Sequence, residues 1–335
     1  MKRFTIEKIK RKLHRKLLGI LGIYVYPSYW NYMFHQDVGN PETSNFYLAA
    51  RPNPGAGIGH QLANWIAGLC WSKQFGLKFA HISFSTDQWE KFLGVGEGET
   101  TVSELKKAGW KVRRIPLFSE NSPETIMIIK QIISSYSGKK VVFLCEQDQF
   151  YKNQYGVMDE IQQKFYHAPA RKNDNLEYSK EHFNIAIHVR RGDIMIDPSN
   201  PNLAMRYLSN DYFEKVLSQV YTHFSASQPQ PIHIYFFSQG LPEDYPEFAK
   251  YPNLHWCMGM GAQDSFLHMV YADLLITSKS SFSYKPALLC KGIKVCPKNF
   301  WHGYPNSEDW IMVENDGTFD ISKLPEIIRV NTAAD

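Results

Sequence analysis

Cysteine is scarce in this sequence, and no two cysteines are spaced as a C-x-x-C pair. Five is an odd number and these residues lie mostly in apolar contexts, which indicates reduced thiols in hydrophobic cores and not a disulfide framework. The chain also lacks an N-x-S/T sequon, so it offers no acceptor for N-glycosylation in a secretory lumen. Both absences favour a cytoplasmic location. The cysteines are Cys70, Cys145, Cys257, Cys290 and Cys296.

Two motifs of nucleotide-binding enzymes are also missing. The sequence contains no D-x-D pair, which removes the usual carboxylate cradle for a metal ion held by a nucleotide-sugar. It contains no G-x-x-x-x-G-K-S/T loop, which excludes a P-loop kinase. We therefore expect no metal site and no cofactor. Cationic side chains would have to replace a metal ion at any diphosphate.

Long apolar runs are missing as well. A transmembrane helix needs ~20 apolar residues, but the clean run at 17–26 ends at Pro27, and Ser28 and Asn31 interrupt the apolar residues beyond it. Residues 1–16 hold eight Lys or Arg and one Glu, a charge of +7, so the net charge of +4 leaves −3 for the rest of the chain. The globular part is therefore not expected to bind nucleic acid through its charge.

The N-terminal arm, residues 1–40, joins this basic start to Leu, Ile, Tyr and Trp residues. Such a segment is typical of peripheral contact with an anionic membrane, where each cation contributes ~1 kcal/mol. We therefore expect a cytoplasmic protein at the membrane face. Two alternatives stay open. One is a short signal peptide or signal-anchor, although no small-x-small cleavage site follows, and the other is a solvated helix.

Length and patterning predict two lobes. The 335 residues exceed the ~250–300 at which a single core stops growing, and a cleft between two lobes would follow. Apolar residues make up 44% and charged residues 21%, close to soluble averages. Strand and helix patterns alternate, which favours an α/β fold with doubly wound parallel sheets. We expect strands at 45–52, 77–84, 110–117, 139–146, 184–190, 231–239, 253–258, 272–278 and 293–297, and helices at 62–75, 123–136, 211–224, from 264 and after 281.

The boundary between the lobes is predicted in the polar run at 168–181, which has no periodic apolar pattern and precedes a clean strand. The expected organisation is therefore an arm at 1–40, an N-terminal lobe at 41–175 and a C-terminal lobe at 176–335. Ligands of doubly wound sheets bind at the carboxyl ends of the strands. The C-terminal lobe opens with such a strand.

The stretch NIAIHVRRGDIM, residues 184–195, places a histidine, two arginines and an aspartate at the end of an apolar strand. Side chains alternate along a strand, so His188 and Arg190 share one face. Arg190 can grip a phosphate with a bidentate fork, and His188 can donate to a phosphate or ribose oxygen. Arg191 points the other way, where Asp193 could orient it. The alternative is a structural ion pair between Arg191 and Asp193 with His188 merely buried.

Two further stretches suggest a phosphate site. In ITSKSSFSYKPALL, residues 276–289, a strand passes into a helix through serines, so Ser281 or Ser283 can cap the helix while its free N–H groups face an anion. The alternative is an ordinary N-cap with no ligand. In the first lobe, PGAGIGHQ allows close backbone approach to a ligand, as glycine loops do at diphosphates. The alternative there is an ordinary tight turn that binds no ligand.

HVRRGD, residues 188–193, resembles the H-x-R-R-x-D signature of fucosyltransferases that make alpha-1,2 and alpha-1,6 linkages. In chain order, GAGIGHQL resembles that group's G-x-G-N-Q loop, and SSFSYKPALL resembles its S-x-F-S motif. FLCEQDQFYKN and IYFFSQ are similar to segments of the bacterial-type alpha-1,2 family. The resemblance covers roughly residues 45–297.

This resemblance implies a GT-B-like pair of Rossmann-type lobes, with the acceptor on the N-terminal side and GDP-fucose on the C-terminal side. It implies an inverting fucosyl transfer without a metal ion. Arg190 would hold the beta-phosphate, His188 the phosphate or ribose, Asp264 the guanine and Ser281 the diphosphate. The full set expected to bind the donor is His188, Arg190, Arg191, Asp193, Ser238, Asp264, Ser281, Phe282, Ser283, Gly57, Gly59, His60 and Gln61.

The sequence departs from the family at two places. His60 replaces the usual asparagine of the glycine loop, and Tyr284 with Lys285 replaces a tryptophan pair, so the acceptor and linkage stay open. The catalytic residues expected are Arg190, His188 and Glu146. Asp148 and His60 are other candidates for a base, and water or the leaving phosphate could take the proton instead.

The expected partners are a nucleotide-sugar donor and a glycan acceptor, in a glycan or a surface polysaccharide. Two rival functions stay open. One is transfer from another nucleotide-sugar on the same fold, and the other is a catalytically silent carbohydrate-binding protein. Competition by GDP against UDP separates the first rival from fucosyl transfer.

Overall fold

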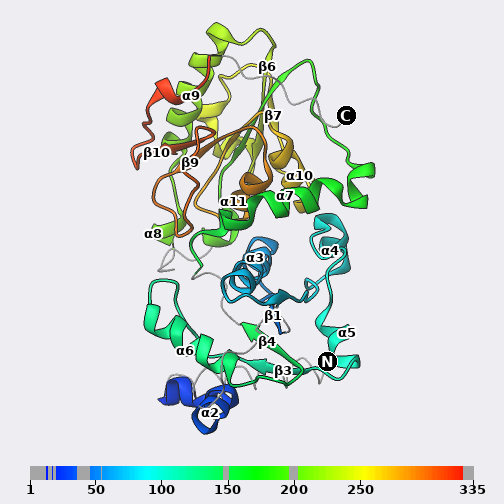
Figure 1. The fold of residues 1–335 in the computed structure, drawn as a ribbon. Helices are drawn as coiled ribbons and strands as arrows, with labels where there is room; N and C mark the ends of the chain where they lie inside the picture. Colours follow the sequence, from blue (N-terminus) through cyan, green and yellow to red (C-terminus); the bar gives the residue numbers. More distant parts are fainter. Residues whose placement is uncertain are drawn as a thin grey trace. The chain divides into compact units, whose positions relative to one another are not determined.

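The computed structural model describes residues 13, 17, 20–35, 46–53, 55–145, 151–195 and 203–326. It divides into two compact units whose segments interleave along the chain. The first unit comprises Met1–Pro54, Ala63–Phe84 and Gly98–Tyr151, and the second Gly55–Leu62, Ser85–Glu97 and Lys152–Asp335. Each unit contains one parallel sheet with helices (Figure 1). The predicted α/β class is therefore confirmed, while the ranges predicted for the arm and two lobes stay predictions.

The first unit is built on a four-stranded sheet in the order β2-β1-β4-β3, with every pairing parallel. The strands are β1 (Tyr47–Ala50), β2 (Lys78–Phe79), β3 (Lys111–Arg114) and β4 (Val141–Cys145). The helices are α2 (Pro27–Phe34), α3 (Ile58–Gln74), α5 (Val102–Lys107) and α6 (Pro123–Ser134), and the first turn of α3 belongs to the second unit.

Both faces of this sheet are covered, as strand alternation requires. Val102 and Leu105 of α5 pack with Ala49 and Val142 on one face. On the other face α3 comes so close to β1 that a Cβ on Gly68 would lie 2.7 Å from the Cβ of Ala50. Glycine at that position lets the helix lie directly on the strand.

The second unit contains a six-stranded parallel sheet in the order β10-β9-β8-β5-β6-β7. Counted from β5, this is the 3-2-1-4-5-6 order of doubly wound dinucleotide-binding folds. The chain order reverses between β5 and β8, so this pair forms the topological switch point. The strands are β5 (Phe183–His188), β6 (Ile232–Phe237), β7 (Leu254–Trp256), β8 (Leu274–Ile276), β9 (Ile293–Pro297) and β10 (Trp310–Val313).

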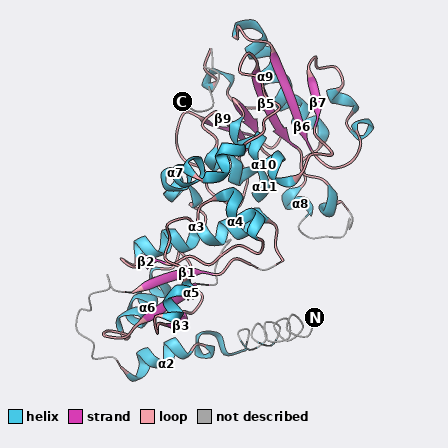
Figure 2. Cartoon of the chain, turned by 90° about the vertical axis from the view of Figure 1, so that its right-hand side faces the viewer, coloured by secondary structure: helices cyan, strands magenta, loops and turns pink. Residues whose placement is uncertain are grey.

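Helices cover both faces of the second sheet (Figure 2). Ile185 and Ile187 of β5 pack in the core that contains Phe213 and Val216 of α9. On the opposite face, the ring of His268 in α10 lies 6.1 Å from that of Phe237. The helices of this unit are α4 (Asp87–Leu93), α7 (Met158–His167), α8 (Leu203–Arg206), α9 (Asn210–Ser227), α10 (Ala262–Tyr271) and α11 (Ser281–Leu289).

A buried carboxylate aligns the two switch-point strands at their amino ends. Asp273, which is 1% exposed, accepts hydrogen bonds from the backbone N of Asn184 at 2.8 Å and from its side-chain Nδ2 at 3.2 Å. Because both partners are removed from water, the bonds oppose slippage of β5 against β8. The carboxyl ends of these strands are thereby held in register.

Most of the predicted strands and helices are confirmed, and their boundaries shift by a few residues. The strand predicted at 77–84 is shorter, because only Lys78–Phe79 pairs with β1 before the isolated bridge at His81. Sequence patterning missed α4, α5, α7, α8 and β10. All five cysteines are free and buried, as expected. Within the described part of the chain, no helix is both long and apolar enough for a membrane span.

Candidate functional site

The candidate site lies at the carboxyl ends of β5 and β8, where the order of the second sheet reverses. His188 ends β5, and its Nδ1 lies 2.8 Å from Oγ of Ser278, two residues beyond β8. Both side chains are buried. The hydrogen bond therefore joins the two strand ends across the switch point, where doubly wound sheets bind their ligands.

Serines fix the turn that follows β8. The backbone N of Ser278 donates to Oγ of Ser283 at 3.2 Å, so Ser283 braces the turn from inside the helix. The N-cap is Ser280, whose side chain accepts from the backbone N of Phe282 at 3.2 Å. The expectation that Ser281 or Ser283 caps the helix is wrong, because α11 begins at Ser281 and the extended residue before it is Ser280.

The glycine loop belongs to the second unit, although sequence order suggests the first lobe. A Cβ on Gly59 would lie 2.7 Å from the carbonyl carbon and oxygen of Ser281, so the start of α3 touches the start of α11. Gln61 holds the loop. Its Nε2 donates to the Ala56 carbonyl and to Ser85 Oγ, and its Oε1 accepts from Ser85 N, each at 2.8 Å.

Gly57 is less constrained than Gly59. A Cβ on Gly57 would meet nothing within 4 Å. His60 lies in the first turn of α3 and is partly exposed. The structure therefore brings Gly59 to the serine turn, while Gly57 lies in the same loop without that close contact.

The two arginines after β5 differ in their surroundings. Arg190 is partly exposed two residues beyond His188. Arg191 donates from Nη1 to the Arg190 carbonyl at 2.8 Å and from Nη2 to Asn210 Oδ1 at 2.6 Å, and its guanidinium lies 4.7 Å from the centre of the Tyr207 ring. Arg191 is thus turned toward the start of α9, as alternation predicts. Asp193 lies in the 3-10 turn Gly192–Ile194, but its side chain is outside the described part, so its pairing with Arg191 stays a prediction.

The turn after β5 is shaped by the loop after β6. Ser238 Oγ donates to the Val189 carbonyl at 2.8 Å and lies 2.6 Å from Tyr245 Oη. Gly192 has φ +70° and lies against the side-chain amide of Gln239, where a Cβ would collide. The motif glycine is therefore required for its left-handed backbone, whereas the Gln239 amide lies at the end of a flexible side chain that can turn away.

Burial keeps His188 neutral. Burial, reinforced by the positive charge of Arg190, lowers the pKa of His188 to about 3. At neutral pH the imidazole can donate or accept a hydrogen bond, but it adds no positive charge. The positive charge of this strand end therefore resides on the arginines.

Phe282 and Asp264 complete the residues expected from the sequence. The Phe282 ring lies 5.6 Å from the His188 ring and 6.2 Å from that of Phe266 in α10. Asp264 is exposed in the first turn of α10, which begins beyond the carboxyl end of β7. It lies at the same edge of the sheet as His188, with no hydrogen bond to it.

Lys279, which the sequence pattern did not single out, lies in the turn between Ser278 and Ser280. Its side chain is partly buried, and burial lowers its pKa. Among the described residues no carboxylate pairs with it. The sequence ITSKSS could have indicated this residue, because a lysine beside a helix N-terminus at a strand end adds positive charge where an anion would bind.

Lys285 has a structural role. It is fully buried, donates from Nζ to Oε1 of the equally buried Gln154, and lies 4.9 Å from the centre of the Tyr284 ring. Lys285 therefore connects α11 to the 3-10 turn Gln154–Val157.

Glu146 and Asp148, the expected bases, lie outside the described residues. Within the described ranges, no group of three or more His, Cys, Asp or Glu side chains is arranged to hold a metal ion. The expectation of a metal-free site stays a prediction.

Several solved structures resemble this chain at low identity. POFUT1 in complex with GDP shares 12% identity over 76% of this chain and 99% of that one, with a TM-score of 0.41. Fucosyltransferase NodZ from Bradyrhizobium shares 13% over 74% and 94%, with a TM-score of 0.43. NodZ alpha-1,6-fucosyltransferase co-crystallized with GDP shares 13% over 83% and 97%, also at 0.43. No family model and no curated protein matches the chain.

The contact between the glycine loop and the serine turn is testable with two neighbouring glycines. Gly59→Ala should lower the free energy of unfolding by about 1–3 kcal/mol, because the new methyl group overlaps the backbone of Ser281. Gly57→Ala, where the Cβ meets open space, is the matched control and should unfold like the wild type. Urea denaturation measures both, and equal stability of the two variants would contradict the contact.

The neutral state of His188 predicts a pH dependence. The unfolded histidine takes up a proton below about pH 6.5, while the folded one stays neutral to about pH 3, so acid favours the unfolded chain. The stability contributed by His188 is complete above pH 6.5 and is lost as the pH falls toward 3. Melting temperatures of wild type and His188→Asn should therefore converge over this window. Parallel curves would show that His188 titrates normally.

Proposed function

We propose that this chain is a glycosyltransferase that moves fucose from GDP-fucose to a sugar hydroxyl. One observation carries the proposal. The histidine of the H-x-R-R-x-D stretch bonds to the serine turn across the switch point, which leaves Arg190 at the strand end where nucleotide ligands of this sheet order bind. The resemblance of this stretch to fucosyltransferases indicates fucose as the transferred sugar and guanine as the base of the nucleotide.

Three groups would bind the diphosphate. Arg190 can form two parallel hydrogen bonds to its oxygens. Lys279 adds a second cation, and the start of α11 adds the positive end of the helix dipole. His188 contributes a hydrogen bond without charge, to a phosphate or ribose oxygen. Ser281 and Gly59 form the wall where the glycine loop meets that helix.

The chemistry proposed is an inverting displacement. The bond from the fucose anomeric carbon to the phosphate oxygen breaks as the acceptor hydroxyl attacks, through an oxocarbenium-like state, and negative charge grows on the leaving GDP. Cations that bind this charge more strongly in the transition state than in the ground state can supply several kcal/mol. Arg190 and Lys279 are suited to that task in place of a metal ion.

We propose that the acceptor binds to the first lobe of a GT-B-like pair. Glu146 is proposed as a base for the acceptor hydroxyl, with water or the leaving phosphate as the other routes for its proton. Asp264 is proposed to meet the guanine. The acceptor is proposed to be a sugar hydroxyl of a glycan or surface polysaccharide, and its linkage stays open. The basic arm would hold the enzyme at the cytoplasmic membrane face.

Loss of Arg190 provides the test of this function. Arg190→Ala should lower kcat/KM for GDP-fucose by about 10²–10³-fold, because it removes a donor from the charge that develops on the leaving group. Arg190→Lys keeps the positive charge but loses the bidentate geometry of the guanidinium. Its kcat/KM should therefore lie between those of Arg190→Ala and the wild type. Turnover is measured by mass spectrometry of products from GDP-fucose with a panel of galactoside and GlcNAc acceptors.

Lys250→Ala is a suitable control, because this exposed lysine pairs with Glu214 before the amino end of β7. It should retain wild-type turnover. Wild-type turnover in Arg190→Ala would refute the mechanism. Competition that is stronger with UDP than with GDP would instead favour a different nucleotide-sugar, and binding of glycans without turnover would favour a carbohydrate-binding protein.

Metal removal tests the proposed replacement of a metal ion by cations. Turnover of GDP-fucose in excess EDTA should equal turnover in Mg²⁺, because Arg190, Lys279 and the α11 N-terminus neutralise the leaving group. A strict dependence on Mg²⁺ would rule out this form of the mechanism while leaving the donor assignment open to the competition assay.

A further inference from the structure

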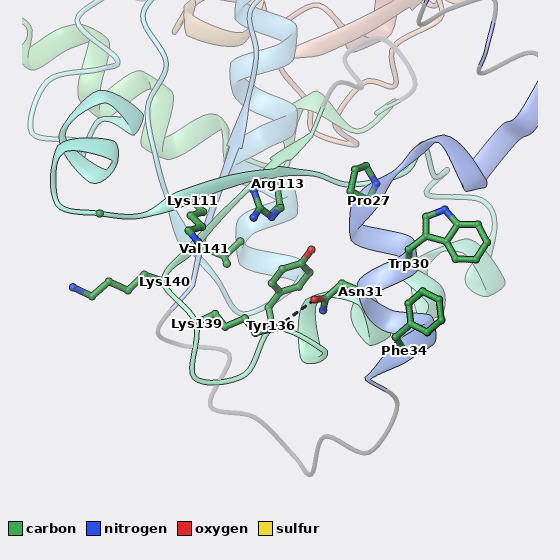
Figure 3. A pocket seen from close by; sticks show the side chains of 11 residues that line it. Pro27, Trp30, Asn31, Phe34, Lys111, Arg113, Tyr136, Lys139, Lys140 and Val141 are labelled. Atoms are coloured by element: carbon green, nitrogen blue, oxygen red, sulfur yellow. Dashed lines mark hydrogen bonds between the residues drawn. The ribbon is translucent and has the colours of Figure 1, made fainter.

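A pocket of about 640 Å³ lies in the first unit, and the residues that line it are different from those assigned to fucosyl transfer (Figure 3). It opens between α2 and the edge formed by β3 and the start of β4. Aromatic side chains of α2 lie at one side, lysines lie at the other, and Tyr136 lies between them. The lining residues are Pro27, Trp30, Asn31, Phe34, Gly109, Lys111, Arg113, Tyr136, Lys139, Lys140 and Val141.

Partly buried hydrogen bonds fix α2 against the rest of the unit. Ser28, which is fully buried, donates from Oγ to the Arg114 carbonyl at 2.6 Å. Asn31 donates from Nδ2 to the carbonyl of Ser135 at 3.0 Å and to its Oγ at 2.9 Å. Because these bonds connect α2 to the ends of both β3 and α6, the pocket walls are held before any ligand arrives.

The pocket is strongly positive. Its described lining contains four cations and no carboxylate. Lys111 and Lys140 are exposed and adjacent, since the backbone N of Lys111 donates to the Lys140 carbonyl at 3.0 Å, and no described carboxylate pairs with either side chain. Lys139 donates to Asn31 Oδ1 at 3.3 Å, and Arg113 donates to the Val112 carbonyl at 3.1 Å. An anion would find several unused N–H donors here.

The rim of the pocket is apolar and exposed. Trp30 is 42% exposed and Phe34 is 77% exposed, and their rings stack with centroids 6.1 Å apart. Ile20, Leu21 and Met33, on the same N-terminal segment, are also exposed. Large aliphatic and aromatic side chains beside lysines are typical of segments that lie in a membrane interface.

We infer that this pocket binds the phosphate headgroup of an anionic phospholipid while α2 and the segment before it enter the bilayer surface. The cations match the headgroup, and the exposed aliphatic residues match the acyl boundary. Nucleic acid fits less well, because it offers nothing apolar to Ile20, Leu21 and Met33. The inference is independent of fucosyl transfer, and it adds a headgroup site of defined residues to the charge of the N-terminal arm.

The test compares two variants of the full chain that lose the same charge. Lys111→Gln/Lys140→Gln removes two cations from the pocket, whereas Lys106→Gln/Lys107→Gln removes two from α5 that do not line it. Binding is measured by co-sedimentation with phosphatidylcholine vesicles that contain phosphatidylglycerol. The pocket variant should bind roughly 10- to 30-fold more weakly than the wild type, and the α5 variant should stay within about threefold of it.

Equal weakening of both variants would overturn the inference, because binding would then follow net charge alone. The inference would also be overturned if the wild type bound pure phosphatidylcholine vesicles as tightly as vesicles that contain phosphatidylglycerol. Circular dichroism melts of both variants establish that they are folded.

The apolar rim is tested in the same assay. Trp30→Ser/Phe34→Ser should lose at least about 10-fold in vesicle affinity. Met127→Ser/Leu117→Ser, which removes two exposed apolar residues of the same unit outside the pocket, should not. Soluble glycerol phosphate separates a lipid from a free phosphate, and a short oligonucleotide tests nucleic acid. If either binds as tightly as vesicles and depends on Lys111 and Lys140, the lipid assignment is wrong.

Discussion

The hydrogen bond between His188 and Ser278 is the constraint on which the candidate site depends. It joins the ends of the two strands at which the order of the second sheet reverses. At the amino ends of the same strands, Asp273 holds the backbone of Asn184. Because both ends of β5 and β8 are fixed, the loops that follow them start from defined positions. The residues that carry charge, Arg190 and Lys279, belong to those loops.

Because His188 is neutral, different residues of the site supply hydrogen bonding and positive charge. A buried imidazolium next to a guanidinium would be costly, so burial and the charge of Arg190 both lower its pKa. The histidine is therefore a fixed hydrogen-bonding element, and the arginine and lysine supply the electrostatics. The glycine loop adds close packing, because the absence of a side chain at Gly59 lets α3 begin against the backbone of Ser281.

Two groups of cationic side chains in the described part of the chain have different surroundings. At the strand ends of the second unit it is concentrated on a few residues among serines and backbone N–H groups, which suits a diphosphate. In the first unit Lys111, Arg113, Lys139 and Lys140 line a pocket with an exposed aromatic rim, which suits a headgroup at an interface. The surrounding polar or apolar groups, and not the charge itself, distinguish the two kinds of ligand.

The sequence by itself determined the α/β class, most strands and helices, and the separation of His188 from Arg191, because side-chain alternation and helix periodicity are local properties of the chain. Tertiary structure decided that Ser278 is the partner of His188, 90 residues away, and that the glycine loop joins the second unit at Ser281. It also decided that lysines from β3 and the start of β4 share a pocket with α2. These contacts depend on strand order and helix packing, which local patterns do not specify.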